Sequence, residues 1–141
     1  MADTLQLDIV APDKLLVREQ VDQVQIPGKG GELGILPGHA PLITELTIGE
    51  IRYVQGGMSH YLAVAWGFAE VLPNKVTILA DTAERAEEIN IARAQEAKAR
   101  AEAELKQGAP DLDYAATQHA LQRAEIRLQV AAHAGHVAPT H

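Results

Sequence analysis

Cysteine is absent from the sequence and serine occurs only once, and both scarcities limit the chemistry that the chain can perform. Without cysteine the chain forms no disulfide and offers no thiolate ligand to a metal. The single serine, Ser59, stands outside any nucleophile-elbow pattern. The Gly28-Lys29 pair is followed by glycine instead of the serine or threonine of a phosphate-binding loop. We therefore expect no catalytic site and no required cofactor.

Long apolar runs are missing as well. The longest mostly apolar segment, residues 61–69, is far shorter than the roughly 20 residues that a helix needs to cross a bilayer. The opening Met-Ala-Asp-Thr lacks the basic and apolar segments of a secretory signal. These features predict that the chain reaches a membrane only through partners.

Positive charge is scarce in the first part of the chain. The formal net charge is −7, and the residues up to Ala83 include 5 basic and 10 acidic side chains, against 7 and 9 in the remainder. Because phosphates attract clustered lysine and arginine, the acidic first part argues against nucleic acid or anionic lipid as its partner.

Residues 5–80 have the pattern of short strands separated by turns. Apolar residues alternate with polar ones, glycines 56 and 57 suit a hairpin turn, and Pro73-Asn74 suits another turn. No segment of helix length separates the strands, so a parallel βαβ arrangement is excluded. We predict an antiparallel β-sandwich or flattened barrel over residues 1–83, with strands near residues 5–10, 24–26, 33–36, 42–47, 50–55, 59–65, 68–72 and 75–80.

The periodicity changes at Asp81, which is suited to cap a helix. Residues 84–107 are rich in helix-forming Ala, Glu, Lys and Arg, and Gly108 and Pro110 end this pattern. A second helical pattern runs over residues 113–132. The complete fold class is thus β + α, with a two-helix antiparallel hairpin over residues 84–132. The tail, residues 133–141, has no periodicity and is expected to be disordered.

Each predicted helix has a thin apolar seam made mostly of alanine. Alanine buries little surface at about 25 cal/mol per Å², so the seam provides few contacts per turn. Elements of this kind open at a low cost in free energy, and we expect the hairpin to detach. The seam residues are Ile91, Ala94, Ala97, Ala101 and Leu105 on the first helix, and Thr117, Leu121, Ala124, Leu128 and Ala131 on the second.

Two clusters of polar side chains have both a functional and an ordinary interpretation. Histidines 133, 136 and 141 are able to chelate a metal, but no carboxylate or thiol completes a site, and we expect no metal there. Arg123 and Arg127 lie four residues apart, and neither has an acid three or four residues away on its own helix. An anion between the helices would relieve this like-charge pair, whereas a solvated surface is the alternative.

A known family matches these features. The segment from Glu32 to Leu42, Glu-Leu-Gly-Ile-Leu-Pro-Gly-His-Ala-Pro-Leu, resembles the GELGI-x-PGHAPL signature of the epsilon subunit of bacterial F-type ATP synthases. Residues 76–83 and the Ala/Glu/Arg-rich segment beyond them match in the same order, so the resemblance covers about residues 5–130. It implies a non-catalytic rotor subunit of the central stalk.

The resemblance also implies partners and a location. In the family the sandwich binds the gamma subunit and the membrane c-ring, while the hairpin extends along gamma into the alpha/beta catalytic head and inhibits ATP hydrolysis. The chain would be a peripheral subunit at the cytoplasmic face of the bacterial plasma membrane. From the residues alone, a small-molecule-binding β-sandwich module with a helical dimerisation pair is the alternative, and coelution with gamma would separate the two.

The family pattern assigns two sets of residues. Pro37 and Pro41 fix the backbone around Gly38, which is able to take a positive φ, so these residues predict a rigid corner. By the family pattern, this corner would meet the ring and gamma and would contain Glu32, Gly38, His39 and Pro41. Residues 89–94 resemble an I/L-D-x-x-R-A motif with which some epsilon subunits bind ATP as a regulatory ligand, and residues 121–128 resemble the segment that supplies two arginines to the phosphates. Position 90 departs from this motif, because asparagine lacks the charge of aspartate, and we expect weak ATP binding. By position the nucleotide-binding residues are Glu84, Ile89, Asn90, Arg93, Ala94, Arg100, Arg123 and Arg127.

Overall fold

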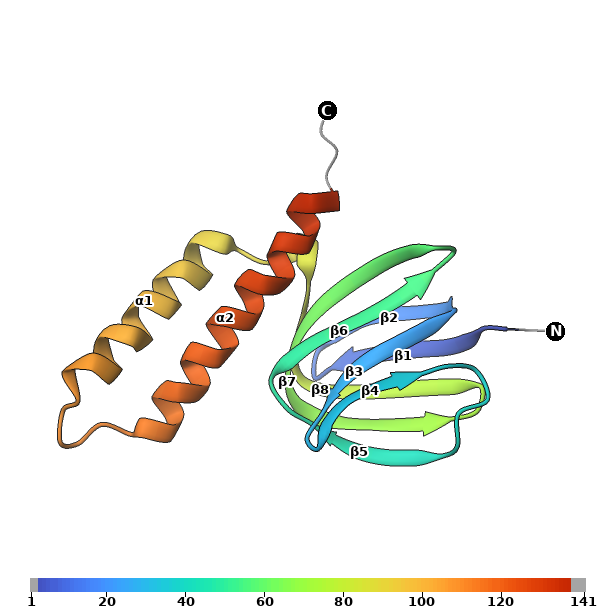
Figure 1. The fold of residues 1–141 in the computed structure, drawn as a ribbon, viewed down its shortest axis with the longest axis horizontal. Coiled ribbons are helices and arrows are strands. Elements are labelled where there is room, and N and C mark those ends of the chain that lie inside the picture. The colour runs from blue at the N-terminus through green and yellow to red at the C-terminus, as the bar shows by residue number, and fades with distance from the viewer. Residues whose placement is uncertain (1–2, 138–141) are drawn as a thin grey trace. The chain divides into compact units, whose positions relative to one another are not determined.

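The computed structural model describes residues 3–137, which form eight strands and two α-helices (Figure 1). The strands all precede the helices, as the sequence pattern predicts. In chain order the elements are β1 (Leu5–Ala11), β2 (Lys14–Val21), β3 (Gln23–Gly28), β4 (Gly31–Ile35), β5 (Leu42–Leu46), β6 (Gly49–Gln55), β7 (Met58–Leu72), β8 (Lys75–Arg85), the 3-10 helix η1 (Ala86–Glu88), α1 (Ile91–Gln107) and α2 (Tyr114–Val137).

The chain divides into two compact units, Met1–Arg85 and Ala86–His141, which we call the sandwich unit and the hairpin unit. The boundary falls two residues beyond the expected one. Strand β8 continues to Arg85 because its last residues pair with the long strand β7, and the guanidinium of Arg85 donates a hydrogen bond to the carbonyl of Leu16. The predicted helix start at Glu84 is therefore wrong, as is the predicted cap at Asp81.

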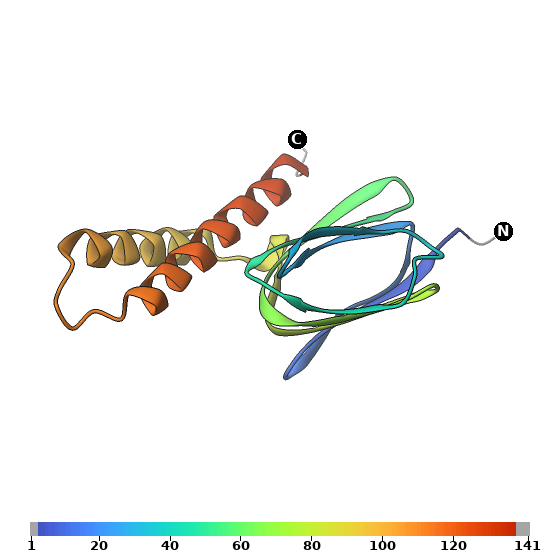
Figure 2. The same ribbon diagram turned by 60° about the horizontal axis from the view of Figure 1, so that its bottom comes forward.

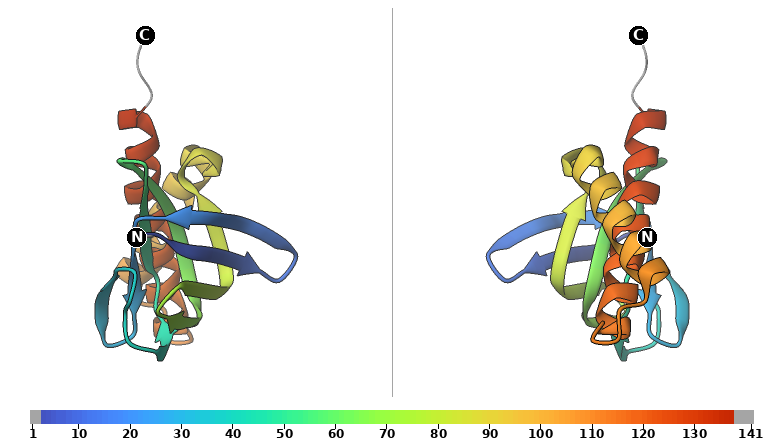
Figure 3. Two further views of the ribbon diagram at one scale, coloured as in Figure 1. Left: turned by 90° about the vertical axis from the view of Figure 1, so that its right-hand side faces the viewer. Right: turned by 90° about the vertical axis from the view of Figure 1, so that its left-hand side faces the viewer.

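The strands of the sandwich unit form one sheet that closes on itself. Their order is β2-β1-β8-β7-β5-β3-β4, and β6 pairs with both β3 and β7. Strand β7 pairs with β6 through its first half and with β5 through its second half, so it passes from one layer to the other. In Figure 2 the strands form a flattened ring, and Figure 3 shows the β1–β2 hairpin projecting from one side of it. All pairs are antiparallel except β1 with β8, which is parallel.

Two strands differ from the sequence prediction. The segments near residues 59–65 and 68–72 are one continuous strand, β7, whose pairing with β8 skips Trp66 and resumes at Gly67; these two residues have positive φ angles of 59° and 121°. A Cβ atom on Gly67 would lie 2.1 Å from the carbonyl oxygen of Leu79, so only glycine fits there. Strand β2 was not predicted, because its consecutive Leu15, Leu16 and Val17 hide the alternation of a strand.

The core of the sandwich unit consists of large aliphatic side chains that are fully buried. Burying one leucine or isoleucine contributes roughly 1.5–3 kcal/mol, so this core is a strong source of stability. Its largest members are Leu5, Leu7, Ile9, Ile26, Ile35, Leu46, Ile51, Leu62 and Ile78.

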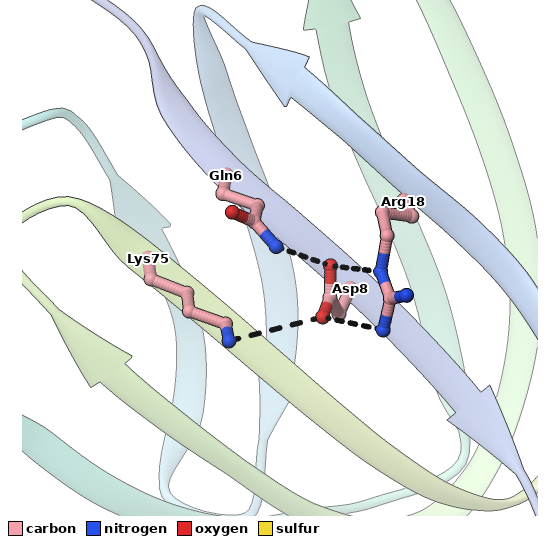
Figure 4. Close-up of polar contacts among 4 residues, drawn as sticks. All are labelled: Gln6, Asp8, Arg18 and Lys75. Atoms are coloured by element: carbon pink, nitrogen blue, oxygen red, sulfur yellow. Dashed lines mark hydrogen bonds and ion pairs between the residues drawn. The ribbon is translucent and has the colours of Figure 1, made fainter.

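A polar cluster around Asp8 links β1 to both of its neighbours, β2 and β8 (Figure 4). Asp8 is only 4% exposed, and its carboxylate accepts hydrogen bonds from Gln6 Nε2 at 3.1 Å and Arg18 Nε at 3.4 Å. Its Oδ2 atom lies 3.3 Å from Arg18 Nη2 and 3.9 Å from Lys75 Nζ. Burial alone would raise the pKa of Asp8, but the hydrogen bonds and the two positive charges together hold it below the ordinary value.

The hairpin unit is held by small side chains. Ala94, Ala101, Thr117, Ala124 and Ala131 are buried. The remaining predicted seam residues Ala97, Leu105, Leu121 and Leu128 are half-buried, whereas Ile91 is 49% exposed and does not belong to the seam. Small residues thus dominate the α1–α2 contact, as predicted.

The helix ends follow ordinary capping rules. Asn90 Oδ1 accepts a hydrogen bond from the Arg93 amide at 3.0 Å and begins α1, while Gly108, with a φ angle of 63°, ends it in the left-handed conformation. Asp113 begins α2 by accepting from the Ala116 amide at 3.1 Å.

Helix α2 is longer than the sequence predicts. It continues to Val137, so the prediction of disorder is wrong for residues 133–137. The predicted tail from residue 138 onward, including His141, lies outside the described residues.

Candidate functional site

A tight corner connects β4 to β5 over residues 36–41. The amide of Gly38 donates to the carbonyl of Pro73 at 2.7 Å, and the amide of His39 donates to the carbonyl of Leu36 at 3.1 Å. Gly38 has a φ angle of 91°, which glycine adopts without the strain of a side chain, as the sequence predicts. The corner is thereby tied to the β7–β8 turn, and it presents Leu36, which is 59% exposed.

His39 and Pro41 both lie in this corner, but they are not equally accessible. Pro41 is exposed, whereas His39 is half-buried and its Nδ1 lies 2.6 Å from the carbonyl oxygen of Ala40. Because a carbonyl oxygen only accepts hydrogen bonds, Nδ1 carries a proton and donates it to this contact. The orientation of the His39 ring is thus fixed by the backbone carbonyl of the next residue, Ala40.

Glu32 lies apart from the corner, contrary to the sequence interpretation that placed it there. It stands at the beginning of β4 and is exposed. Extended backbone advances about 3.3 Å per residue, so the Cα atoms of Glu32 and Leu36 are roughly 13 Å apart. Glu32 instead lines an open hollow of about 260 Å³, together with Gly30, Gly31, Leu33, Leu42 and Thr44.

An exposed apolar surface, which we call the apolar face, lies on β5, β7 and β8. Ile43, Phe68 and Leu79 are 70%, 52% and 55% exposed, and Phe68 stands directly opposite Leu79 in the β7–β8 ladder. Between them is an open hollow of about 270 Å³, which Ala69, Glu70 and Thr77 also line. Clusters of exposed apolar side chains are typical of surfaces that bind another protein.

The apolar face was not predicted from the sequence, although the sequence contains a signal for it. Residues 78–80, Ile-Leu-Ala, are apolar in succession, so both faces of β8 carry apolar side chains and only one of these faces points to the core.

The residues assigned to nucleotide binding divide between the two units. Glu84 is in β8, opposite Ala63, and belongs to the sandwich unit. The others belong to the hairpin unit. Of these, Ala94 is buried in the seam and Ile89 is buried before α1, whereas the side chains of Arg93, Arg100 and Arg123 are exposed and that of Arg127 is half-buried.

Asn90 has a structural role in this arrangement. Its Oδ1 caps α1, and asparagine and aspartate are about equally good helix caps. The departure from the family motif at this position therefore leaves the start of the helix intact.

A β-sandwich followed by a helical hairpin is the domain order of one class of ATP synthase subunit. Residues 4–86 match the family described as ATP synthase, Delta/Epsilon chain, beta-sandwich domain. Residues 87–132 match the ATP synthase, Delta/Epsilon chain, long alpha-helix domain. No helix among residues 3–137 is long and apolar enough to cross a membrane.

Similar proteins and structures agree with this class. The ATP synthase epsilon chain of Koribacter versatilis is 67% identical over 111 residues, covering 79% of this chain and 78% of that one. That of Nitratidesulfovibrio vulgaris is 52% identical over 130 residues, covering 92% and 97%. A chain in the cryo-EM structure of Euglena gracilis mitochondrial ATP synthase, OSCP/F1/c-ring, aligns with a TM-score of 0.69 at 26% identity, covering 96% of this chain and 82% of its own.

The chain therefore belongs to the family of ATP synthase epsilon subunits. Members of this family are non-catalytic subunits of the central stalk, and the prediction that the chain is not itself an enzyme is confirmed by this membership. Of the two function classes left open by the residues, the stalk subunit is the one that the relatives support.

Proposed function

We propose that the chain is a rotor subunit that couples the catalytic head to the membrane ring and restrains ATP hydrolysis through a mobile hairpin. The single observation that carries this proposal is the contrast between a sandwich unit with a large aliphatic core and a hairpin unit closed by alanine. A stable unit is suited to permanent attachment, whereas a weakly closed one is suited to change its conformation. The location that follows is peripheral, at the cytoplasmic face of the bacterial plasma membrane.

Attachment requires a surface on the sandwich unit. The apolar face at Ile43, Phe68 and Leu79 is available to bind the gamma subunit, since burying these side chains would remove apolar area from water. The corner at Gly38, His39 and Pro41, together with Glu32 on β4, is available to bind the c-ring. The sandwich unit would in this way connect two partners.

The hairpin unit would supply regulation. Opening the seam would let α1 and α2 extend along gamma, where Arg123 and Arg127 would face acidic side chains of the alpha/beta head. In the closed hairpin the same arginines, with Arg93 and Arg100, would hold the phosphates of ATP. At a tenfold excess over its dissociation constant, ATP would stabilise the closed form by about 1.4 kcal/mol.

The restraint is tested by measuring ATP hydrolysis of the reconstituted head with gamma and either the full chain or residues 1–85. We expect faster hydrolysis with the fragment, because it keeps the attachment surfaces and lacks the hairpin. Equal binding of both forms to gamma is the control. Slower hydrolysis with the fragment at equal binding would contradict the proposed restraint.

ATP regulation is tested separately by calorimetry on the full chain. We expect binding at millimolar ATP that becomes tighter in Asn90→Asp, because a carboxylate accepts stronger hydrogen bonds than an amide. Absence of binding heat in both proteins would exclude ATP as a regulatory ligand and would leave the mechanical role in place.

A further inference from the structure

Glu32 is held by a chain of hydrogen bonds that crosses three neighbouring strands. Gln25 Nε2 on β3 donates to Glu32 Oε1 on β4 at 3.1 Å. Arg52 Nη2 on β6 donates to Gln25 Oε1 at 3.2 Å. Gln25 thus lies between a carboxylate and a guanidinium, and both ends of its amide are occupied.

The orientation of this amide follows from the chemistry of its two partners. Arginine has only donors and an ionised carboxylate has only acceptors, so the carbonyl oxygen of Gln25 faces Arg52 and its amino group faces Glu32. The opposite orientation would place donor against donor and acceptor against acceptor. The order guanidinium, amide, carboxylate aligns the amide dipole with both charges.

Backbone pairing brings the three side chains together. Gln25 is directly opposite Arg52 in the β3–β6 ladder, and Glu32 is opposite Pro27, two residues along β3. Residues two positions apart on a strand share a face, so Gln25 and the pair Pro27–Glu32 lie on the same side of the sheet. Gln25 and Arg52 are half-buried, whereas Glu32 is exposed at the hollow described above.

We propose that Gln25 and Arg52 are positioning residues that hold the Glu32 carboxylate in the orientation with which it meets a hydrogen-bond donor of its partner. The proposal rests on the proposed function, in which Glu32 belongs to the surface that binds the ring. A carboxylate on an exposed strand otherwise samples several rotamers, and fixing it before binding reduces the entropy lost on association. Gln25 and Arg52 act through Glu32 and need not touch the partner.

The geometry is tested first on the full chain alone, from the side-chain amide signals of glutamine in ¹H–¹⁵N NMR spectra. We expect the Gln25 signals to shift in Glu32→Ala and in Arg52→Met, because each substitution removes one of its hydrogen bonds. Gln23 is a matched internal control, since it is an exposed glutamine two positions along the same strand. Unchanged Gln25 signals in both variants would overturn the proposal without bearing on the proposed function.

The role in binding is tested by titrating the full chain with gamma onto the purified c-ring. Glu32→Ala is expected to weaken binding, and Gln25→Ala and Arg52→Met are each expected to weaken it by about three- to tenfold, the range of one net hydrogen bond. Gln25→Ala should add nothing in the Glu32→Ala background, and Arg52→Lys, which keeps a donor, should restore most of the affinity. Gln23→Ala is the control variant and should bind normally.

The outcomes separate the two proposals. Additive losses from Gln25→Ala and Glu32→Ala would show that Gln25 acts independently of the carboxylate, which overturns the positioning role and leaves the interface at Glu32 intact. Normal binding by Glu32→Ala would overturn the assignment of Glu32 to the ring surface, and the positioning role with it. Equal urea midpoints for all variants exclude a loss of folding as the cause.

Discussion

The sandwich unit and the hairpin unit use opposite kinds of side chain to close. The sandwich unit buries leucine and isoleucine on several strands at once, and its fully buried members come from almost the whole length of residues 5–80. The hairpin unit buries mainly alanine along one line of contact between α1 and α2. Because buried apolar area sets most of the stability, the first unit is expected to resist unfolding and the second to open more easily.

Under the proposed function, this difference would let one chain serve as both an attachment and a switch. A switch needs two states whose free energies differ by little, so that a ligand or partner can reverse their populations. An attachment instead needs one folded state that is much lower in free energy than any alternative. The sequence separates the two requirements at Arg85 and Ala86, where the sheet ends and the helical unit begins.

The largest expected effect comes from removing a core side chain of the sandwich unit. Ile78 is fully buried in β8, and Ile78→Ala should lower the free energy of unfolding by about 2–5 kcal/mol. Urea unfolding followed by the fluorescence of the single tryptophan, Trp66 in β7, measures this change in the sandwich unit itself.

Ile43→Ala is the matched control for this measurement, because Ile43 is the same residue type but 70% exposed. Its effect should stay within about 0.5 kcal/mol. Equal losses for the two substitutions would show that burial in the sandwich unit does not determine its stability as we describe.

A smaller effect is expected at the first helix of the hairpin unit. Asn90→Ala removes the cap of α1 and should cost about 1 kcal/mol, whereas Asn90→Asp preserves the cap and should cost almost nothing. Helical circular dichroism during heating measures the loss, and Trp66 fluorescence should remain unchanged if the two units unfold separately. A shift of the tryptophan transition by Asn90→Ala would show that they unfold as one.

The smallest effect concerns acid stability of the sandwich unit. The folded-state pKa of Asp8 is below its ordinary value of 3.8, so the carboxylate stabilises the fold fully above that pH. This contribution is lost as the pH falls below 3.8 and through the lower folded-state pKa. Arg18 and Lys75 are 61% and 42% exposed, so solvent screening should keep the loss in Asp8→Asn at about 1 kcal/mol or less at pH 7.

Urea unfolding of both proteins from pH 7 to pH 2 measures this contribution. We expect the difference between the native chain and Asp8→Asn to be constant above about pH 5 and to vanish in strong acid. A difference that grows as the pH falls would contradict the sign of the shift.

Local patterns were sufficient to predict much of the fold. Alternating apolar residues identified most strands, and the hairpin turn at Gly56 and Gly57 is present with φ angles of 58° and 82°. Gly108 ends α1 as expected, because the left-handed conformation at a helix end is a local property of glycine. The alanine seam followed from spacing alone, since residues three and four apart share a helix face.

Features that depend on distant partners were not predictable in this way. The extension of β8 through Asp81 to Arg85 depends on pairing with β7, which overrides the capping pattern of the local sequence. The succession of apolar residues at 78–80 indicates apolar side chains on both faces of β8, but the exposure of Phe68 and Leu79 depends on what covers the outer side of the sheet, which the sequence pattern does not contain. The hydrogen bonds from Arg52 through Gln25 to Glu32 require the register of three strands.

Native-state hydrogen exchange on the full chain tests the contrast between the two units most directly. Amides in the β7–β8 ladder should exchange only through global unfolding of the sandwich unit, while amides in α1 and α2 should exchange faster, through opening of the hairpin alone. Equal protection of the helices and the β7–β8 ladder would contradict the account, because a hairpin as stable as the sandwich could not serve as a switch.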